Sequence, residues 1–178
     1  MRFIILLIGL ITCCMGQTGS DIVPLEENCE APSFCLPSLE HDYIYLRDYC
    51  GETLRKPWLK EKYVVVLSFF ATWCKPCIAE IPHLEKINTE FKDKPLKIFL
   101  INVGEEKEKI KEFLSGNPVN LDILVDRFQK TAEKYDALTL PRLFVIDMNG
   151  IIRRSQKGFS NAELFENEMR HLISTLIQ

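Results

Sequence analysis

The chain has 178 residues, of which 47% are hydrophobic and 26% charged, a composition typical of one globular domain with a well-buried core. Its formal net charge is -3 at pH 7, so no broad cationic surface is available to neutralise nucleic-acid phosphates or acidic lipid headgroups. We therefore expect no nucleic acid among its partners.

The amino terminus has the pattern of a signal peptide. One positive charge, Arg2, precedes an apolar run over residues 3–11, which is too short for the roughly 20 residues that cross a bilayer as a helix. Small residues within 14–16 predict cleavage that removes residues 1–16. Residues 10–13 instead resemble a lipoprotein signal, whose cysteine would become an acylated amino terminus. Both interpretations predict an extracytoplasmic protein, periplasmic or in the cell envelope, and the second adds a lipid tether to the membrane.

Beyond the signal, residues 17–30 are polar and without period, which predicts a tether ahead of a folded domain over 31–178. Of the seven cysteines, two fall in the predicted signal, and the others are Cys29, Cys35, Cys50, Cys74 and Cys77. An oxidising compartment permits structural disulfides, and an odd number leaves one thiol over or paired outside the chain. For the first three we expect one structural bridge plus one free or buried thiol, with all three pairings open.

Hydrophobic patterning predicts the elements that follow. Weak alternation over 34–46, around Pro37, favours an edge hairpin. The continuous β-branched and aromatic run over 63–70 predicts a strand buried on both faces, and a helical pattern then continues through Phe91.

The rest of the chain continues the alternation of strands and helices. Strands are predicted over 96–103, 121–125, 143–147 and 151–154, and helices over 105–114, 128–138 and 162–177. We interpret the charged run at the start of the 105–114 helix as a solvated face. The order predicts an α/β fold with a mixed central β-sheet flanked by helices, extended at the amino terminus by a β-hairpin.

The segment Cys74-Lys75-Pro76-Cys77 lies at the junction between the buried strand and the following helix. The helix macrodipole and unpaired backbone N–H groups favour a thiolate at Cys74, which predicts the nucleophile. Cys77 lies most of a turn further on, where it can resolve a mixed disulfide. Lys75 either favours the thiolate or is simply an exposed side chain, and Pro76 pre-sets the first helical turn.

Two other uses of the cysteine pair are weaker. A zinc site needs two further ligands, but there is no second Cys-x-x-Cys or His-x-x-x-His, and the nearest candidate, His83, is more simply a helix surface residue. A purely structural bridge in so small a loop would remove little entropy from the unfolded chain. We therefore predict dithiol–disulfide exchange, with no metal and no bound cofactor.

The segment 69–82, which contains the cysteine pair, resembles the active-site segment of the thioredoxin superfamily. The resemblance is to its TlpA/ResA-like branch of exported, often membrane-tethered oxidoreductases. Residues 140–150 resemble the cis-proline loop and next strand of that family, and residues 31–37 its lead-in. This resemblance implies a thioredoxin-like fold from about residue 31 to the end.

The resemblance also implies roles for residues around the cysteines. Trp73 would flank the disulfide, and Pro82 would kink the helix. Glu80 would relay the proton that Cys77 loses, a task that an acid in the preceding strand performs in ordinary thioredoxins, where this chain has Ser68. The alternative is a surface Glu80 with an ordinary pKa.

In the cis-proline loop, Pro141 would be cis and would face Cys74, and Leu140 would present its backbone to a bound peptide as an added strand. Leu140 replaces the usual Thr or β-branched residue, and Arg142 replaces a small one. Both are expected to line the partner surface. Arg142 would lower the pKa of Cys74 or select acidic or anionic partners, or else face outward.

TlpA/ResA-like proteins usually reduce disulfides of extracytoplasmic proteins such as apocytochrome c, with electrons from a membrane thiol transporter. The resemblance therefore implies disulfide-containing or dithiol protein partners and a reductive direction, with oxidase or isomerase activity left open. A peroxiredoxin-like peroxidase is an alternative, but it expects a Thr or Ser where Ala71 precedes Cys74. A non-catalytic binding module on the same fold is another.

Overall fold

The computed structural model describes residues 27–40 and 42–178. The predicted signal peptide, the alternative lipidation site and most of the predicted tether lie outside these residues. The described end of the tether is already part of the fold, because the backbone N–H of Asn28 donates to the carbonyl of Ile152 over 2.7 Å and Glu30 bridges to Ile151. Within the described part of the chain, no helix is both long and apolar enough to span a membrane.

A five-stranded mixed sheet, in the order β5-β4-β3-β6-β7, forms the centre of the molecule. The central strand β3 (Val64–Phe70) is parallel to β4 (Leu96–Val103) and antiparallel to β6 (Arg142–Ile146). The outer strands are β5 (Asp122–Asp126) and β7 (Ile152–Lys157). Every residue of β3 is buried, which confirms the strand predicted to be covered on both faces.

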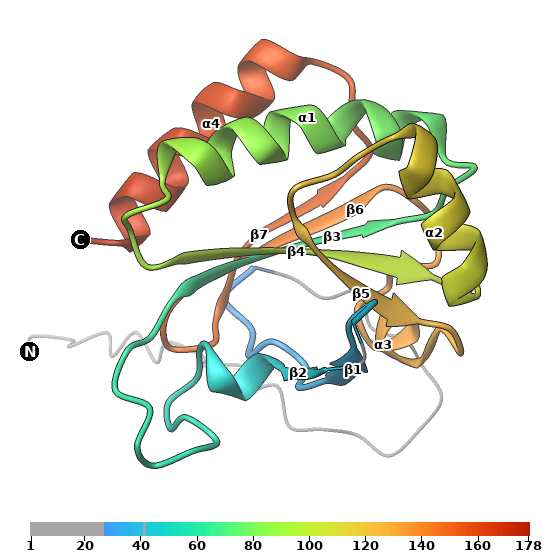
Figure 1. Ribbon diagram of the computed structural model, residues 1–178. Coiled ribbons are helices and arrows are strands. Elements are labelled where there is room, and N and C mark those ends of the chain that lie inside the picture. The colour runs from blue at the N-terminus through green and yellow to red at the C-terminus, as the bar shows by residue number, and fades with distance from the viewer. Residues whose placement is uncertain (1–26, 41) are drawn as a thin grey trace, which may run out of the picture.

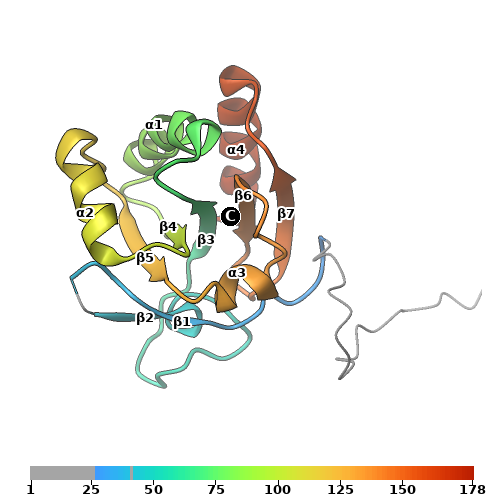
Figure 2. The ribbon, with the colours of Figure 1, turned by 90° about the vertical axis from the view of Figure 1, so that its right-hand side faces the viewer.

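Helices and a hairpin cover opposite faces of this sheet (Figures 1 and 2). One face carries α1 (Lys75–Glu90), α2 (Lys107–Gly116) and α4 (Ala162–Leu176). The other carries the predicted hairpin, β1 (Cys35–Pro37) with β2 (Tyr43–Tyr45), the short 3-10 helix η1 (Leu46–Asp48), and α3 (Lys130–Lys134). The predicted mixed α/β sheet with an amino-terminal hairpin is therefore confirmed.

Side-chain alternation along β3 divides the core into two clusters. Val64, Val66 and Phe70 face α1, whereas Val65, Leu67 and Phe69 face the hairpin and α3. Ser68 shares the parity of the first set, so a hydroxyl lies on the helix-covered face, beneath α1.

The helix predicted over 128–138 is much shorter in the structure. It is confined to α3, because Gln129 before it (φ 60°) and Asp136 after it (φ 48°) adopt left-handed backbone conformations that no helix continues through. By contrast, α1 runs through Pro82 to Glu90.

The expected bridge among Cys29, Cys35 and Cys50 does not form. Each of the three possible pairings needs Cys35 or Cys50, and both are thiols. Cys35 is exposed on the hairpin, whereas Cys50 is buried in the core beneath it, with its thiol 3.9 Å from the carbonyl oxygen of Leu46. Burial raises the pKa of Cys50 to about 12, so this thiol is unreactive at neutral pH.

Candidate active site

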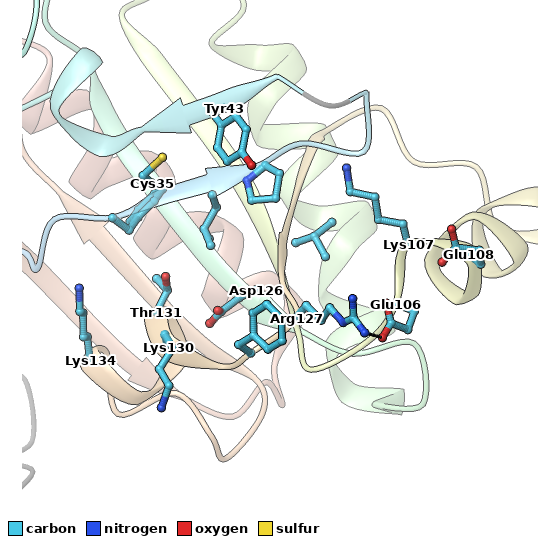
Figure 3. Close-up of a pocket in the computed structure, with 15 residues that line it drawn as sticks. Cys35, Tyr43, Glu106, Lys107, Glu108, Asp126, Arg127, Lys130, Thr131 and Lys134 are labelled. Carbon is cyan, nitrogen blue, oxygen red and sulfur yellow. Dashed lines mark ion pairs between the residues drawn. The ribbon is translucent and has the colours of Figure 1, made fainter.

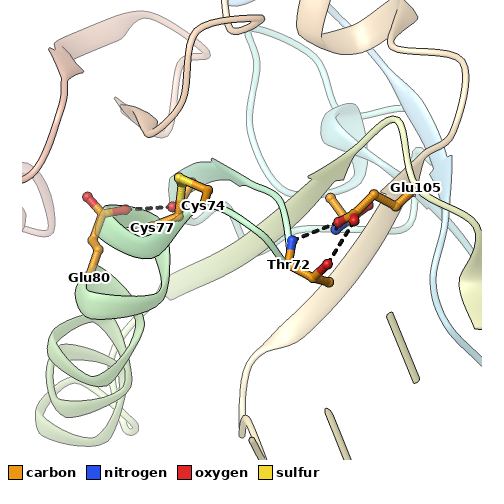
Figure 4. Close-up of a disulfide and its surroundings, with 7 residues drawn as sticks. Thr72, Cys74, Cys77, Glu80 and Glu105 are labelled. Atoms are coloured by element: carbon orange, nitrogen blue, oxygen red, sulfur yellow. Dashed lines mark hydrogen bonds between the residues drawn. A yellow bond between two sulfur atoms is a disulfide. The ribbon is translucent and has the colours of Figure 1, made fainter. Parts of the chain in front are cut away.

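A disulfide joins Cys74 and Cys77 at the point where β3 gives way to α1 (Figure 4). Cys74 is the N-cap residue of the helix, and Pro76 lies in its first turn. Both cysteines are buried, with 4% and 1% of their surface exposed, while Trp73 beside them is 67% exposed. Once the disulfide is reduced, the sulfur of Cys74 lies at the positive end of the α1 dipole, where a thiolate is favoured.

Lys75 and Pro76 are also exposed at this end of α1. The disulfide therefore lies just beneath a surface formed by the side chains on either side of Cys74. The cis-proline loop leads into β6, whose first residue, Arg142, pairs with Phe69 near the end of β3 that precedes the disulfide. The peptide bond between Leu140 and Pro141 is cis, as predicted, and Leu140 is half-buried against both core clusters.

Glu80 is buried one helical turn after Cys77, with 1% of its surface exposed. Its Oε2 accepts a hydrogen bond from the Ser68 hydroxyl over 2.8 Å, and its Oε1 has no hydrogen-bond partner among the described residues. Burial raises the pKa of Glu80 to about 7, against the opposing effect of the Ser68 hydrogen bond. The alternative of a surface carboxylate is therefore wrong, and this acid can both take up and release a proton near neutral pH.

Glu105 is a site residue that the sequence interpretation missed. It is 6% exposed, and its carboxylate accepts hydrogen bonds from the Thr72 backbone N–H at 2.7 Å and the Thr72 hydroxyl at 2.8 Å (Figure 4). Thr72 lies in the turn that leads to Cys74. Glu105 therefore fixes the active-site turn to the end of β4, and the prediction of a solvated face is wrong at this position.

Two further groups hold the Glu105 carboxylate. The Asn102 amide donates to it over 2.8 Å, and the Lys109 ammonium lies 2.6 Å away. Burial raises the pKa of Glu105, but the hydrogen bonds from Lys109, Asn102 and Thr72 together outweigh it and leave the pKa below its usual value. A signal in the sequence was available, because Asn102 is a polar residue within a buried strand and Glu105 follows that strand after a single glycine.

Arg142 does not lie where the sequence interpretation placed it. It is 3% exposed, and its guanidinium carbon lies 4.7 Å from the centroid of the Phe144 ring, within the core cluster on the hairpin side of the sheet. Cys74 and Cys77 belong to the cluster on the opposite face. The prediction that the Arg142 side chain lines the partner surface is therefore wrong, as is the outward-facing alternative.

Burial lowers the pKa of Arg142, and its Nε has no hydrogen-bond partner among the described residues. The side chain is held instead by the aromatic ring beneath it. Because the sheet lies between this guanidinium and the disulfide, the structure gives no support to the idea that Arg142 lowers the pKa of Cys74.

A cavity of about 570 Å³ lies apart from the disulfide, between the β1–β2 hairpin and the connection from β5 to α3 (Figure 3). Its wall is apolar at Phe34 and Leu36, and its rim carries the ion pair between Arg127 and Glu106, at 2.6 Å. Neither active-site cysteine lines it. A reactive pair beneath an exposed surface, outside such a cavity, suits a macromolecular substrate better than a small molecule.

No group of three or more His, Cys, Asp or Glu side chains that could hold a metal ion occurs among the described residues. The family model described as AhpC/TSA family matches residues 28–155. The chain belongs to this family.

The names of similar proteins indicate more specifically which kind of family member this chain resembles. The chain is 32% identical to the thiol-disulfide oxidoreductase ResA of Geobacillus kaustophilus over 144 residues, which cover 81% of this chain and 75% of that protein. It is 28% identical to ResA of Bacillus subtilis strain 168 over 165 residues, covering 90% and 86%. The crystal structure of a Chlorobium tepidum protein assigned as thiol:disulfide interchange protein DsbE superposes with a TM-score of 0.73 at 25% identity, covering 86% of this chain and 99% of that one.

These relatives confirm the resemblance drawn from residues 69–82. The chain is a ResA-like member of the thioredoxin superfamily, with a thioredoxin-like fold, and it is a thiol-disulfide oxidoreductase that acts on protein disulfides.

Proposed function

We propose that this oxidoreductase reduces disulfides of protein partners outside the cytoplasm, with Cys74 as the nucleophile and Cys77 as the resolving thiol. The observation that carries the proposal is the arrangement of three groups on one helix. Cys74 lies at the amino terminus of α1, Cys77 is bonded to it within the first turn, and Glu80 is buried one turn further on.

The first step forms a mixed disulfide. The thiolate of reduced Cys74 attacks one sulfur of the partner disulfide, so a bond forms between Cys74 and that sulfur while the partner's other sulfur leaves as a thiolate. Trp73, Lys75 and Pro76 surround the point of attack and would contact the partner, and the backbone of Leu140 would pair with it as an added strand.

The second step resolves this intermediate. The Cys77 thiol gives its proton to the Glu80 carboxylate, and the resulting thiolate attacks the sulfur of Cys74. The bond between Cys74 and the partner breaks, the Cys74–Cys77 disulfide closes, and the partner leaves with both sulfurs reduced. A pKa of about 7 suits Glu80 to this task, because both its protonation states are populated at neutral pH.

The two electrons travel in the cysteine pair itself, so the reaction calls for no bound cofactor. The enzyme must be reduced again after each turnover, and a membrane thiol-electron transporter is the expected donor. The signal-peptide pattern of residues 1–16 supports an extracytoplasmic location, with a lipid tether as the alternative form of export. The likeness to ResA supports a role in cytochrome c maturation.

Trapping of the mixed disulfide tests the order of the cysteines. A Cys77→Ser variant should accumulate a covalent adduct with an oxidised protein substrate, because nothing resolves it, and a Cys74→Ser variant should form none. Both variants should lose reductase turnover, measured as thiols released from the substrate. A Cys77→Ser variant with wild-type turnover would contradict the proposal and favour a module that binds partners without dithiol chemistry.

The peroxidase alternative has less support. The position three residues before Cys74, where that chemistry expects a hydroxyl, holds the fully buried side chain of Ala71. Turnover of hydrogen peroxide at a rate comparable to disulfide reduction would revive it.

A further inference from the structure

Ser68 is a polar residue in the central strand of the sheet, where every other residue is apolar. Its side chain is 1% exposed, and all of β3 is buried with it. Its register partners on the neighbouring strands, Leu100 on β4 and Leu143 on β6, belong to the core cluster on the helix-covered face. A buried hydroxyl in such surroundings costs free energy unless it forms a hydrogen bond.

Glu80 on α1 provides the partner that this hydroxyl needs. The Ser68 hydroxyl donates to Oε2 of Glu80 over 2.8 Å, and Oε1 is buried without a partner among the described residues. Within the described part of the chain, the carboxyl of Glu80 therefore depends on Ser68 for its hydrogen bonding. The bond joins the central strand of the sheet to the helix that carries both cysteines.

The Ser68 hydroxyl favours one protonation state of this carboxyl. A hydrogen bond from a hydroxyl to an ionised carboxylate is roughly twice as strong as one between neutral groups. The bond therefore stabilises ionised Glu80, whereas burial favours the neutral acid, and the balance leaves the pKa of Glu80 at about 7. Because a hydroxyl can also accept a hydrogen bond, Ser68 can serve the protonated carboxyl by rotation alone.

We propose that Ser68 is a positioning residue that keeps the Glu80 carboxyl able to accept the Cys77 proton at neutral pH. The inference rests on the proposed function, in which this carboxyl takes up that proton during resolution. The proton moves from the Cys77 sulfur to the Glu80 carboxylate, and the thiolate left behind breaks the bond between Cys74 and the partner. No electrons move in the proton transfer, and the proton can return to Cys77 when the disulfide is reduced again.

Other titratable groups around Glu80 leave this control to Ser68. On α1 and α4 they are Cys77, His83, Lys86, Glu166 and Arg170. Cys77 is in the disulfide, and the other four form ion pairs centred on Glu166. The strands β4 and β6 present leucines beside Ser68. Burial and the Ser68 hydrogen bond, rather than the charge of a neighbour, thus set the pKa of Glu80.

A matched pair of variants, Ser68→Val and Ser68→Thr, tests the role, because the two side chains have nearly the same shape and differ in the hydroxyl. Reduced enzyme is mixed with an excess of a synthetic peptide that contains one disulfide. Decay of the mixed disulfide is followed by rapid acid quench and thiol trapping between about pH 5.5 and pH 9. The rate in Glu80→Gln, which measures resolution without this carboxyl, is subtracted at each pH.

The pH at which resolution reaches half its maximal rate should rise by about one unit in Ser68→Val, because the carboxylate loses its donor. The maximal rate should not fall, since a carboxylate with a higher pKa is a stronger base. Ser68→Thr should keep the wild-type midpoint. Val66→Ala, on the same face of β3 and fully buried, is the packing control: it should lower stability but leave the midpoint unchanged.

A direct titration of Glu80 in the oxidised enzyme gives a readout besides activity. Nuclear magnetic resonance follows the carboxyl carbon of isotopically labelled glutamate, and the Glu80 signal is identified by its absence in Glu80→Gln. Its titration midpoint should rise by about one unit in Ser68→Val and in the smaller Ser68→Ala, and should stay in place in Ser68→Thr.

Unchanged midpoints in both Ser68→Val and Ser68→Ala would overturn the proposal. So would equal shifts in Ser68→Val and Ser68→Thr, since these would place the effect in packing and not in the hydroxyl. Equal resolution rates in wild type and Glu80→Gln would contradict the proton transfer of the proposed function itself, and with it this role of Ser68, whatever the titration of Glu80 gives.

Discussion

Glu80 places an ionisable carboxyl group in the core at a cost in stability. Because burial raises its pKa from 4.5 to about 7, the folded chain keeps the proton at pH values where the unfolded chain has lost it. The folded state is therefore penalised as the pH rises from about 4.5 through about 7. The carboxyl lies one helical turn from Cys77, so the group that lowers the stability of the folded state is also the one proposed to take up the proton of Cys77.

Replacement of Glu80 by Gln should separate stability from activity. The oxidised variant should be more stable than wild type at pH 8, by up to about 3 kcal/mol, and equally stable near pH 4, because only the charged form is penalised. Urea unfolding at the two pH values measures this difference. In the reduced variant, resolution of the mixed disulfide should become slow at every pH. Equal stability of both proteins at pH 8, or unchanged resolution, would rule out the assigned role.

Glu105 is the residue that ties the active-site turn to the sheet. A Glu105→Ala variant leaves the Thr72 backbone N–H and the Asn102 amide without their acceptor, and each unsatisfied buried donor costs about 1–3 kcal/mol. We expect a loss of stability of at least about 2 kcal/mol, measured by urea unfolding, together with slower attack by Cys74. Glu106→Ala, at the exposed neighbouring position, is the control: it removes only an exposed ion pair with Arg127, so it should cost less than about 1 kcal/mol and leave attack by Cys74 unchanged.

At the scale of elements, a network of ion pairs joins α1 to α4. Glu166 on α4 binds His83 and Lys86 on α1, and Arg170 binds both Glu166 and Glu90. These pairs hold the helix that carries the cysteines against the carboxy-terminal helix. The position of α1 is thus fixed by contacts on two sides, one with the sheet and one with α4.

The pH dependence of this network is predictable. Hydrogen bonds from Lys86, His83 and Arg170 lower the pKa of Glu166 to about 2, so its contribution to stability is complete above the unfolded value of 4.5 and is lost as the pH falls towards 2. A Glu166→Gln variant should therefore melt at a lower temperature than wild type at pH 7. The difference should shrink steadily below pH 4.5. A constant difference across this range would show that the carboxylate charge is not what joins the helices.

The central sheet and the active-site turn could be predicted because the sequence patterns that indicate them lie within short segments of the chain. An apolar run, interrupted only at Ser68, marks β3, and the Cys-x-x-Cys that follows it marks the turn. The length of α3 was not predictable, since nothing in the sequence indicates that Gln129 and Asp136 adopt left-handed backbone conformations. Glu105 was missed because its partner, Thr72, is 33 residues away in sequence. Arg142 was misplaced because an arginine is rarely buried without an ionic partner, and only packing against Phe144 shows that it is.

At the scale of the whole molecule, the sheet separates two groups of buried side chains. The helix-covered face holds the disulfide, Glu80 and the α1–α4 network, and the hairpin-covered face holds the aromatic cluster with Arg142 and the buried Cys50 thiol. Among the cysteines that the structure describes, only Cys74 and Cys77 combine proximity, a helix amino terminus and a nearby buried acid. We therefore expect dithiol–disulfide exchange to take place at the end of β3 and the start of α1.

The reduction potential of the Cys74–Cys77 couple tests the central proposal most directly. It is measured by equilibration with dithiothreitol or glutathione followed by thiol trapping, with Cys74→Ser as the control. If the protein is a reductant that receives electrons from the membrane, its reduction potential should lie at or below that of thioredoxin, about -270 mV. A value near that of a strong oxidant, about -120 mV, would contradict the reductive direction, and the absence of any reversible couple would contradict the catalytic role itself.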